Sequence, residues 1–162
     1  HWILSNMADC PLEIEGVPFK NSEHLFQTLK FATSESITAV YQAQNAKMTA
    51  KHWQTIDGHR RADWGQIVLD VMKFCLQQKY EQCPEFRKEL ESNPHFHLLT
   101  EEFVGKFACI YKIDGISVLI FHLSGGKYEA YFGDIYNATD VNISNAQRFV
   151  TLAINILNET TN

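Results

Sequence analysis

The chain has 162 residues, of which 45% are hydrophobic and 20% are charged, a globular composition that excludes a disordered or fibrous protein. This length is sufficient to close a hydrophobic core, so we expect one domain spanning residues 1–162. The formal net charge of −5 argues against a protein that coats nucleic acid through bulk charge. This net charge is still compatible with a local basic pocket that binds one nucleotide.

The cysteines show neither a C-x-x-C pair nor a paired histidine spacing, so we expect no metal site. They stand at Cys10, Cys75, Cys83 and Cys109. Four cysteines allow two disulfides in a secreted protein, but nothing in the sequence resembles a signal peptide. No apolar run approaches the roughly 18 residues of a membrane span. We therefore expect a cytoplasmic protein, with a natural N-terminal piece missing before His1 as an open alternative.

The first third of the chain predicts short strands followed by helices. The apolar stretch 2–7 predicts a strand running into a loop. Residues 12–19 alternate around Glu15-Gly16, which predicts a hairpin. A helix is expected over residues 21–31, with Asn21 or Ser22 as its N-cap. Further helices are expected over residues 37–44, 49–53, 63–79 and 84–90, of which 63–79 has the clearest apolar periodicity.

After Asn93-Pro94 the periodicity changes to that of strands. Strands are expected over residues 96–100, 107–113, 116–123 and 128–132, and Asp114-Gly115 favours a tight hairpin turn. Ser144 is expected to cap a last amphipathic helix. The predicted class is α+β: a mostly helical single domain with short strands near both ends and an inserted β-hairpin at about 103–128.

The helix at 21–31 presents an acid, an amide and an amine together. Glu23, Gln27 and Lys30 recur at i, i+4 and i+7, so they share one narrow stripe of the helix. Taken alone, this stripe is also typical of an ordinary solvated helix face. His24 points about 100° away from Glu23 and is expected to be structural.

These residues belong to a longer set of motifs. Leu4-Ser5-Asn6-Met7 is followed by Ser22-Glu23-His24-x-Phe26-Gln27-x-x-Lys30-Phe31 and by Arg61-x-Asp63-Trp64. The set closely resembles the NADAR family over Leu4 to about Glu102. Members of that family are N-glycosidases and related proteins associated with NAD and ADP-ribose. They include enzymes that cleave early intermediates of riboflavin synthesis and enzymes that remove ADP-ribose from guanine bases.

Beyond Glu102 the chain departs from the family pattern. Glu129-Ala130-Tyr131-Phe132-Gly133 fits the family's Asp-x-x-Trp-Gly motif with Asp replaced by Glu and Trp by Phe. Asn145 still resembles the family's asparagine at the start of the last helix. Trp53-Gln54 stands where many members have Gly-Arg, so an amide replaces one guanidinium.

The resemblance implies roles for specific residues in cleaving an N-glycosidic bond. Positive charge builds at the anomeric carbon as the base leaves, and a carboxylate stabilises it or orients water. Glu23 is the first candidate for that carboxylate and Glu129 the second, so both must meet in one pocket. Lys30 has three open roles: it holds a phosphate, pairs with Glu23, or attacks C1 as an amine whose pKa burial has lowered. The expected substrate-binding residues are Asn6, Gln27, Arg61, Trp64, Phe132, Gly133 and Asn145.

The resulting hypothesis is a hydrolase of the N-glycosidic bond of a ribosylated base, without a cofactor. The expected substrate is of the ADP-ribose or NAD type, such as ADP-ribosylated guanine, including guanine in DNA. One alternative is an N-glycosidase acting on a ribosylaminopyrimidine intermediate of riboflavin synthesis. The other is a non-catalytic module that binds an ADP-ribose-like nucleotide. Neither a membrane partner nor a particular oligomeric state is expected from the sequence.

Overall fold

The computed structural model describes residues 3, 6–92, 110–113, 116–119 and 143–161. Its elements are, in chain order, β1 (Leu12–Ile14), β2 (Val17–Phe19), α1 (Ser22–Thr28), α2 (Ser34–Gln42), α3 (Ala46–Trp53), α4 (Trp64–Gln82), α5 (Pro84–Ser92), β3 (Ile110–Ile113), β4 (Ile116–Leu119) and α8 (Ile143–Thr161). The described part is mostly helical with two small antiparallel sheets, so the predicted α+β class is confirmed.

The N-terminal hairpin forms as predicted. β1 and β2 pair antiparallel with Leu12 opposite Phe19 and Ile14 opposite Val17. Glu15 and Gly16 both have positive φ, +49° and +87°, which matches the two-residue turn that continues the twist of a hairpin. Alternation buries one face of the pair, and that face joins the core.

Helices α1, α2 and α3 each begin at a polar N-cap. Asn21 accepts from the backbone N–H of His24, Thr33 from that of Ser36, and Asn45 from that of Met48. The cap at Asn45 corrects one prediction, because α3 begins at Ala46 and not at Thr49. Two of the three extra residues, Ala46 and Lys47, line the candidate site described below.

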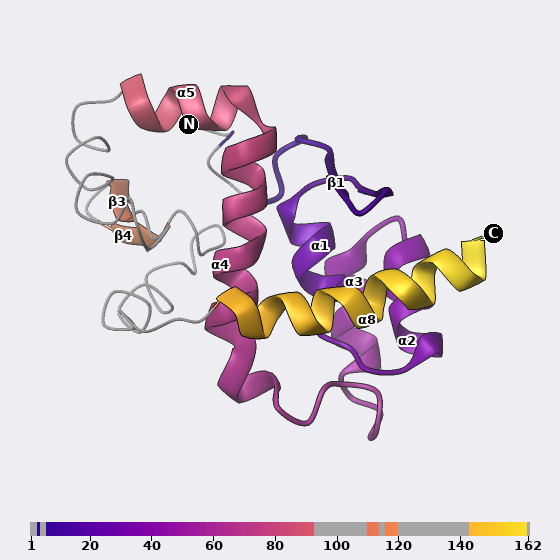
Figure 1. Ribbon diagram of the computed structural model, residues 1–162. Coiled ribbons are helices and arrows are strands. Elements are labelled where there is room, and N and C mark those ends of the chain that lie inside the picture. The colour runs from indigo at the N-terminus through magenta and orange to yellow at the C-terminus, as the bar shows by residue number, and fades with distance from the viewer. Residues whose placement is uncertain (1–2, 4–5, 93–109, 114–115, 120–142, 162) are drawn as a thin grey trace.

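Helix α4 is the long central element of the fold, and α8 crosses it in Figure 1 before running past α2. α1 packs against α4, α2 and α3. The apolar periodicity predicted for residues 63–79 is confirmed, because α4 buries one stripe between α1 and α8. That stripe contains Trp64, Ile67, Val71, Met72, Phe74, Cys75 and Leu76. Within the described helices, none is long and apolar enough to cross a membrane.

The remaining helices and strands confirm two further predictions and correct one. α5 begins at Pro84 as expected, and β3 and β4 form the hairpin expected within 103–128. α8 begins at Ile143, so Ser144 lies inside its first turn rather than at its cap. The strands expected over 96–100 and 128–132 lie outside the described residues.

The apolar start of residues 2–7 does not form the predicted strand at Ile3, whereas the loop predicted after it is confirmed at Asn6 and Met7. Ile3 lies in a 3₁₀ turn, and Asn6 and Met7 lie in a turn. The backbone carbonyl of Asn6 accepts from the N–H of Glu23 at 3.0 Å, so Asn6 caps the start of α1.

One disulfide joins two distant cysteines that the sequence pattern does not single out. Cys10 and Cys83 are bonded across a sequence separation of 73, with their Cα atoms 6.2 Å apart. The bond ties the segment before β1 to the C-cap of α4. Cys75 is free and fully buried, as expected of a small apolar side chain. The cytoplasmic location stays a prediction.

Lys79 on α4 is a fully buried lysine. Its Nζ donates to the carbonyl of Ile3 at 2.6 Å and lies 4.5 Å from the ring centroid of Phe86. Burial lowers the pKa of Lys79 to about 7, and the charge of Glu85 opposes that shift. The lysine therefore stabilises the fold most in its neutral form.

This burial predicts a pH-dependent stability. Between pH 7 and about 10 the unfolded chain holds the Lys79 proton and the folded chain does not, so the free energy of unfolding rises with pH. We expect Lys79→Met to lower that slope, measured by urea unfolding at several pH values. The exposed Lys88→Met on α5 is the control and should keep the wild-type slope. Equal slopes in both variants would contradict the prediction.

Candidate active site

The start of α1 is held by Asn6, which is fully buried. The Ser22 hydroxyl donates to Asn6 Oδ1 at 3.0 Å, and the Glu23 backbone N–H donates to the Asn6 carbonyl. Asn6 Nδ2 lies 3.6 Å from the sulfur of Met72 on α4. Asn6 thus anchors the first turn of α1 to α4 and thereby fixes the position of the Glu23 backbone.

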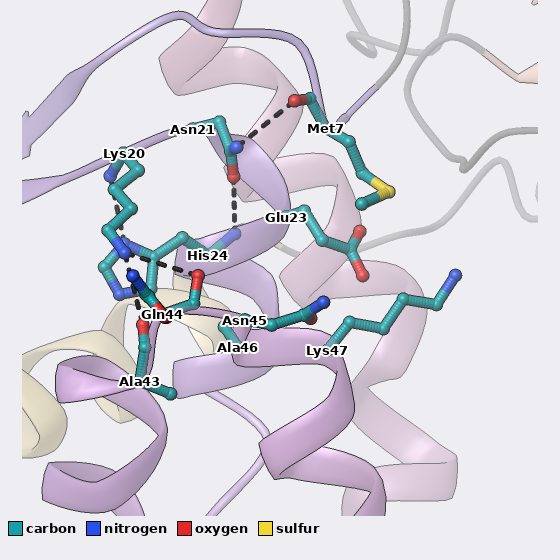
Figure 2. Close-up of a pocket in the computed structure, with 10 residues that line it drawn as sticks. All are labelled: Met7, Lys20, Asn21, Glu23, His24, Ala43, Gln44, Asn45, Ala46 and Lys47. Carbon is teal, nitrogen blue, oxygen red and sulfur yellow. Dashed lines mark hydrogen bonds between the residues drawn. The ribbon is translucent and has the colours of Figure 1, made fainter.

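Glu23 is a nearly buried acid that still faces a pocket. Its side chain is 6% exposed, and its Oε1 accepts from Gln27 Nε2 at 2.7 Å. Among the described residues, Gln27 is the one side chain that donates to this carboxylate. Glu23 also lines the pocket of Figure 2, so the carboxylate keeps a free hydrogen-bonding position beside open space.

The pocket lies between the loop at Met7, the start of α1 and the start of α3. Its volume is about 140 Å³, and it is lined by Met7, Lys20, Asn21, Glu23, His24, Ala43, Gln44, Asn45, Ala46 and Lys47. Figure 2 shows the Glu23 carboxylate and the Lys47 ammonium directed toward the same side. Lys20 lies at the other end, where its Nζ donates to the carbonyls of Ala43 and Gln44.

A second pocket of about 310 Å³ lies elsewhere, between the β1–β2 hairpin, α4 and α8. It is larger, but its two acids, Glu13 and Glu15, are exposed residues of the hairpin. None of the predicted site residues lines it. The smaller pocket beside Glu23 is therefore the candidate active site.

Lys30 lies one helical turn beyond Gln27, just after α1 ends. Its Nζ donates to Gln54 Oε1 at 2.5 Å and lies 5.9 Å from the ring centroid of Trp64. Burial lowers the pKa of Lys30, the charge of Arg60 lowers it further, and Glu23 acts in the opposite direction. Of the three roles left open, the direct salt bridge with Glu23 is not formed between these two described side chains.

Arg61 lies in the segment just before α4, and Trp64 is the first residue of that helix. The Arg61 backbone N–H donates to the Lys30 carbonyl at 3.0 Å, which joins this segment to the end of α1. The Arg61 guanidinium donates twice to the Asp63 carboxylate, each time at 3.1 Å. Trp64 is 7% exposed and packs on Phe26 with ring centroids 5.2 Å apart.

His24 makes structural contacts, in agreement with its predicted role. Its Nδ1 accepts from the Lys20 backbone N–H at 3.0 Å, which leaves the proton on Nε2 to be donated to the Tyr41 carbonyl at 2.8 Å. Burial lowers its pKa, which favours this neutral ring. The ring also packs against Phe19 and Tyr41.

Direct or backbone contacts link Asn6, Glu23, Gln27, Lys30, Arg61 and Trp64, but of these six residues only Glu23 lines the pocket. Glu129, Phe132 and Gly133 lie outside the described residues, so the meeting of two carboxylates stays a prediction. Asn145 lies in the first turn of α8, and its side chain is outside the description.

Sequence reasoning missed most of the pocket wall, including the polar side chains of Lys20, Asn45 and Lys47. Asn45 is an N-cap, and an asparagine just before Ala46-Lys47 is a start signal that an earlier helix boundary would have included. Lys20 and Lys47 carry no signal of their own, because single exposed lysines are usually solvated.

A nearly buried acid, with one side open to a small pocket, defines a candidate acid-dependent hydrolase or nucleotide-binding site. The sequence profile described as NADAR domain matches residues 1–102, more than half of the chain, and the protein therefore belongs to the NADAR domain family. The resemblance seen in the motifs is confirmed.

Individual relatives are similar at low identity. A riboflavin biosynthesis protein of Vibrio vulnificus is 28% identical over 82 residues, which cover 51% of this chain and 22% of that protein. N-glycosidase YbiA of Escherichia coli strain K12 and of Shigella boydii is 28% identical over 84 residues, 52% of each chain. The chain thus matches about half the length of the N-glycosidases and less of the riboflavin protein. No solved structure is significantly similar to it.

Proposed function

We propose that this protein hydrolyses the N-glycosidic bond of a ribosylated base, with Glu23 as its main catalytic carboxylate. The observation that carries the proposal is the state of Glu23, which is 6% exposed yet lines a pocket with one side of its carboxylate unengaged. A carboxylate held in this way is suited to a developing positive charge, because burial strengthens the electrostatic interaction. Membership of a family with relatives named N-glycosidase supports it.

In the proposed reaction, the C1–N bond of the glycoside breaks as water adds to C1. Glu23 stabilises the positive sugar and takes the proton of the attacking water, while an acid protonates the leaving base. Glu129 is proposed as that acid. Lys30 is proposed either to contact charge on the substrate or to attack C1 as an amine while the C1–N bond to the base breaks, after which water cleaves the sugar–lysine bond and frees the amine. Burial lowers the pKa of Lys30, which is the direction that the second role needs.

The remaining predicted residues are proposed to surround the substrate. Arg61 offers charge to a phosphate, although Asp63 already occupies two of its donors. Trp64 and Phe132 are proposed to hold a ring, and Gly133 and Asn145 to complete the wall. Asn6 acts through the backbone of Glu23.

The substrate is proposed to be of the ADP-ribose or NAD type, such as ADP-ribosylated guanine. The pocket of about 140 Å³ is smaller than the roughly 300–1,000 Å³ of pockets that enclose a drug-sized ligand. At this size the pocket is proposed to hold the sugar, with the rest of a dinucleotide outside it. The same small size favours a second candidate, a ribosylaminopyrimidine, which the name of the Vibrio vulnificus relative also suggests.

The test is incubation of the protein with NAD, ADP-ribose, guanine-ADP-ribosylated DNA and the pyrimidine riboside, with released base followed by chromatography. Release from guanine-ADP-ribosylated DNA or NAD supports the first substrate class, and release from the pyrimidine riboside supports the second. Saturable binding of ADP-ribose, without release of a base from any substrate, would contradict the proposed hydrolase activity and indicate a binding module.

Lys47 is expected to contribute to substrate binding. Its ammonium faces the same side of the pocket as Glu23, where a phosphate of the substrate would be attracted to it and to the start of α3. We expect Lys47→Ala to raise KM up to about fivefold with little change in kcat, because an exposed ion pair contributes about 1 kcal/mol or less. Lys51→Ala, an exposed lysine of the same helix outside the pocket, is the control. An unchanged KM for Lys47→Ala would contradict the assignment.

A further inference from the structure

Gln27 has a geometry that its predicted role as a substrate-binding residue does not explain. It lies one turn after Glu23 on α1, is 8% exposed, and donates Nε2 to Glu23 Oε1 at 2.7 Å. Its own Oε1 is buried and has no hydrogen-bond partner among the described residues. Gln27 is also absent from the wall of the pocket.

The unpaired side-chain carbonyl of Gln27 shows which contact orients its amide group. If the amide were turned by 180°, its oxygen would face the oxygen of an ionised Glu23, and two acceptors would oppose each other. In the observed orientation the N–H group meets the carboxylate, while the carbonyl bonds to nothing in the described structure. An unsatisfied buried acceptor costs about 1–3 kcal/mol. The contact with Glu23 is therefore the one hydrogen bond that sets the position of this side chain.

We propose that Gln27 is a positioning residue that holds one oxygen of Glu23 by a hydrogen bond and leaves the other oxygen turned toward the pocket. An N–H donor stabilises the charged form of a carboxylate and leaves a protonated acid without that bond. The i, i+4 spacing places the donor and the acceptor on the same face of one helix. The inference rests on the proposed function only for its catalytic consequence.

The hydrogen bond is tested directly by the titration of Glu23, which does not require turnover. The carboxyl ¹³C resonance of Glu23 is assigned by its loss in Glu23→Gln, and its titration is followed in wild type, Gln27→Met and Thr28→Val. Gln27→Met keeps the length of the side chain but removes the donor, so we expect the titration midpoint to move up by about one pH unit. Thr28→Val is the control, because it removes a buried hydrogen bond of the same helix to the His24 carbonyl. It should leave the midpoint unchanged.

The catalytic consequence has a separate readout. If the wild type turns over a glycoside, Gln27→Met should lower kcat about tenfold with a nearly unchanged KM, and the acidic limb of its pH–rate profile should shift upward. Gln27→Glu should shift that limb further, because two adjacent buried carboxylates do not both ionise readily. An unmoved Glu23 midpoint in folded Gln27→Met would overturn the inference. A wild type without turnover would instead count against the proposed function alone.

Discussion

Replacing Glu23 with glutamine should abolish turnover while the protein stays folded. The substitution keeps the size of the side chain and removes its charge, so no anion remains to stabilise the sugar or to take a proton from water. We expect kcat to fall by at least about 10³-fold, near the upper part of what one acid–base group contributes. Released base at saturating substrate measures the loss, and thermal unfolding followed by circular dichroism verifies the fold.

Glu35→Gln is the matched control for this substitution. Glu35 is an exposed acid in the first turn of α2 and is absent from the pocket wall, so its variant should retain wild-type kcat. A folded Glu23→Gln protein with wild-type kcat would remove Glu23 from the catalytic role. Turnover would then have to depend on another acid, and Glu129 would be the next residue to substitute.

Breaking the disulfide between Cys10 and Cys83 should greatly lower the free energy of unfolding. The bond closes a loop with a sequence separation of 73 that contains β1, β2 and helices α1 to α4. A cross-link over a loop of this length stabilises by about 4 kcal/mol in the chain-entropy model, because it restricts the unfolded chain. We expect Cys10→Ser/Cys83→Ser to lose about 2–4 kcal/mol in urea unfolding, and Tm to fall by roughly 10 °C.

Reductant separates the loss of the bond from the effect of the serines. Dithiothreitol should lower the urea midpoint of the wild type and leave that of the double variant unchanged. Alkylation under native, non-reducing conditions, read by peptide mass spectrometry, should leave Cys10 and Cys83 unmodified. Modification of both residues, together with a midpoint that does not respond to reductant, would show that the bond does not form in solution.

Local signals in the sequence determined much of the N-terminal fold. The Glu15-Gly16 turn, the capping residues before α1 and α2, and the apolar period of α4 each depend on neighbours within a few residues. Such signals act through short-range backbone geometry and hydrogen bonding, so they can be recognised without the rest of the chain. The placement of Gln27 beside Glu23 follows from helix geometry in the same way, whereas the helix predicted over residues 21–31 ends at Thr28 and leaves Lys30 outside it.

Tertiary packing decided what each of these three residues does. The sequence places Gln27 beside Glu23, but only burial by the surrounding helices leaves the Gln27 carbonyl without a partner and directs its amide to the carboxylate. Gln54, from the end of α3, accepts from Lys30 in place of Glu23. The disulfide and the Asn6 anchor likewise join residues far apart in the chain. Contacts of this kind depend on how the elements pack, and no local period in the sequence encodes them.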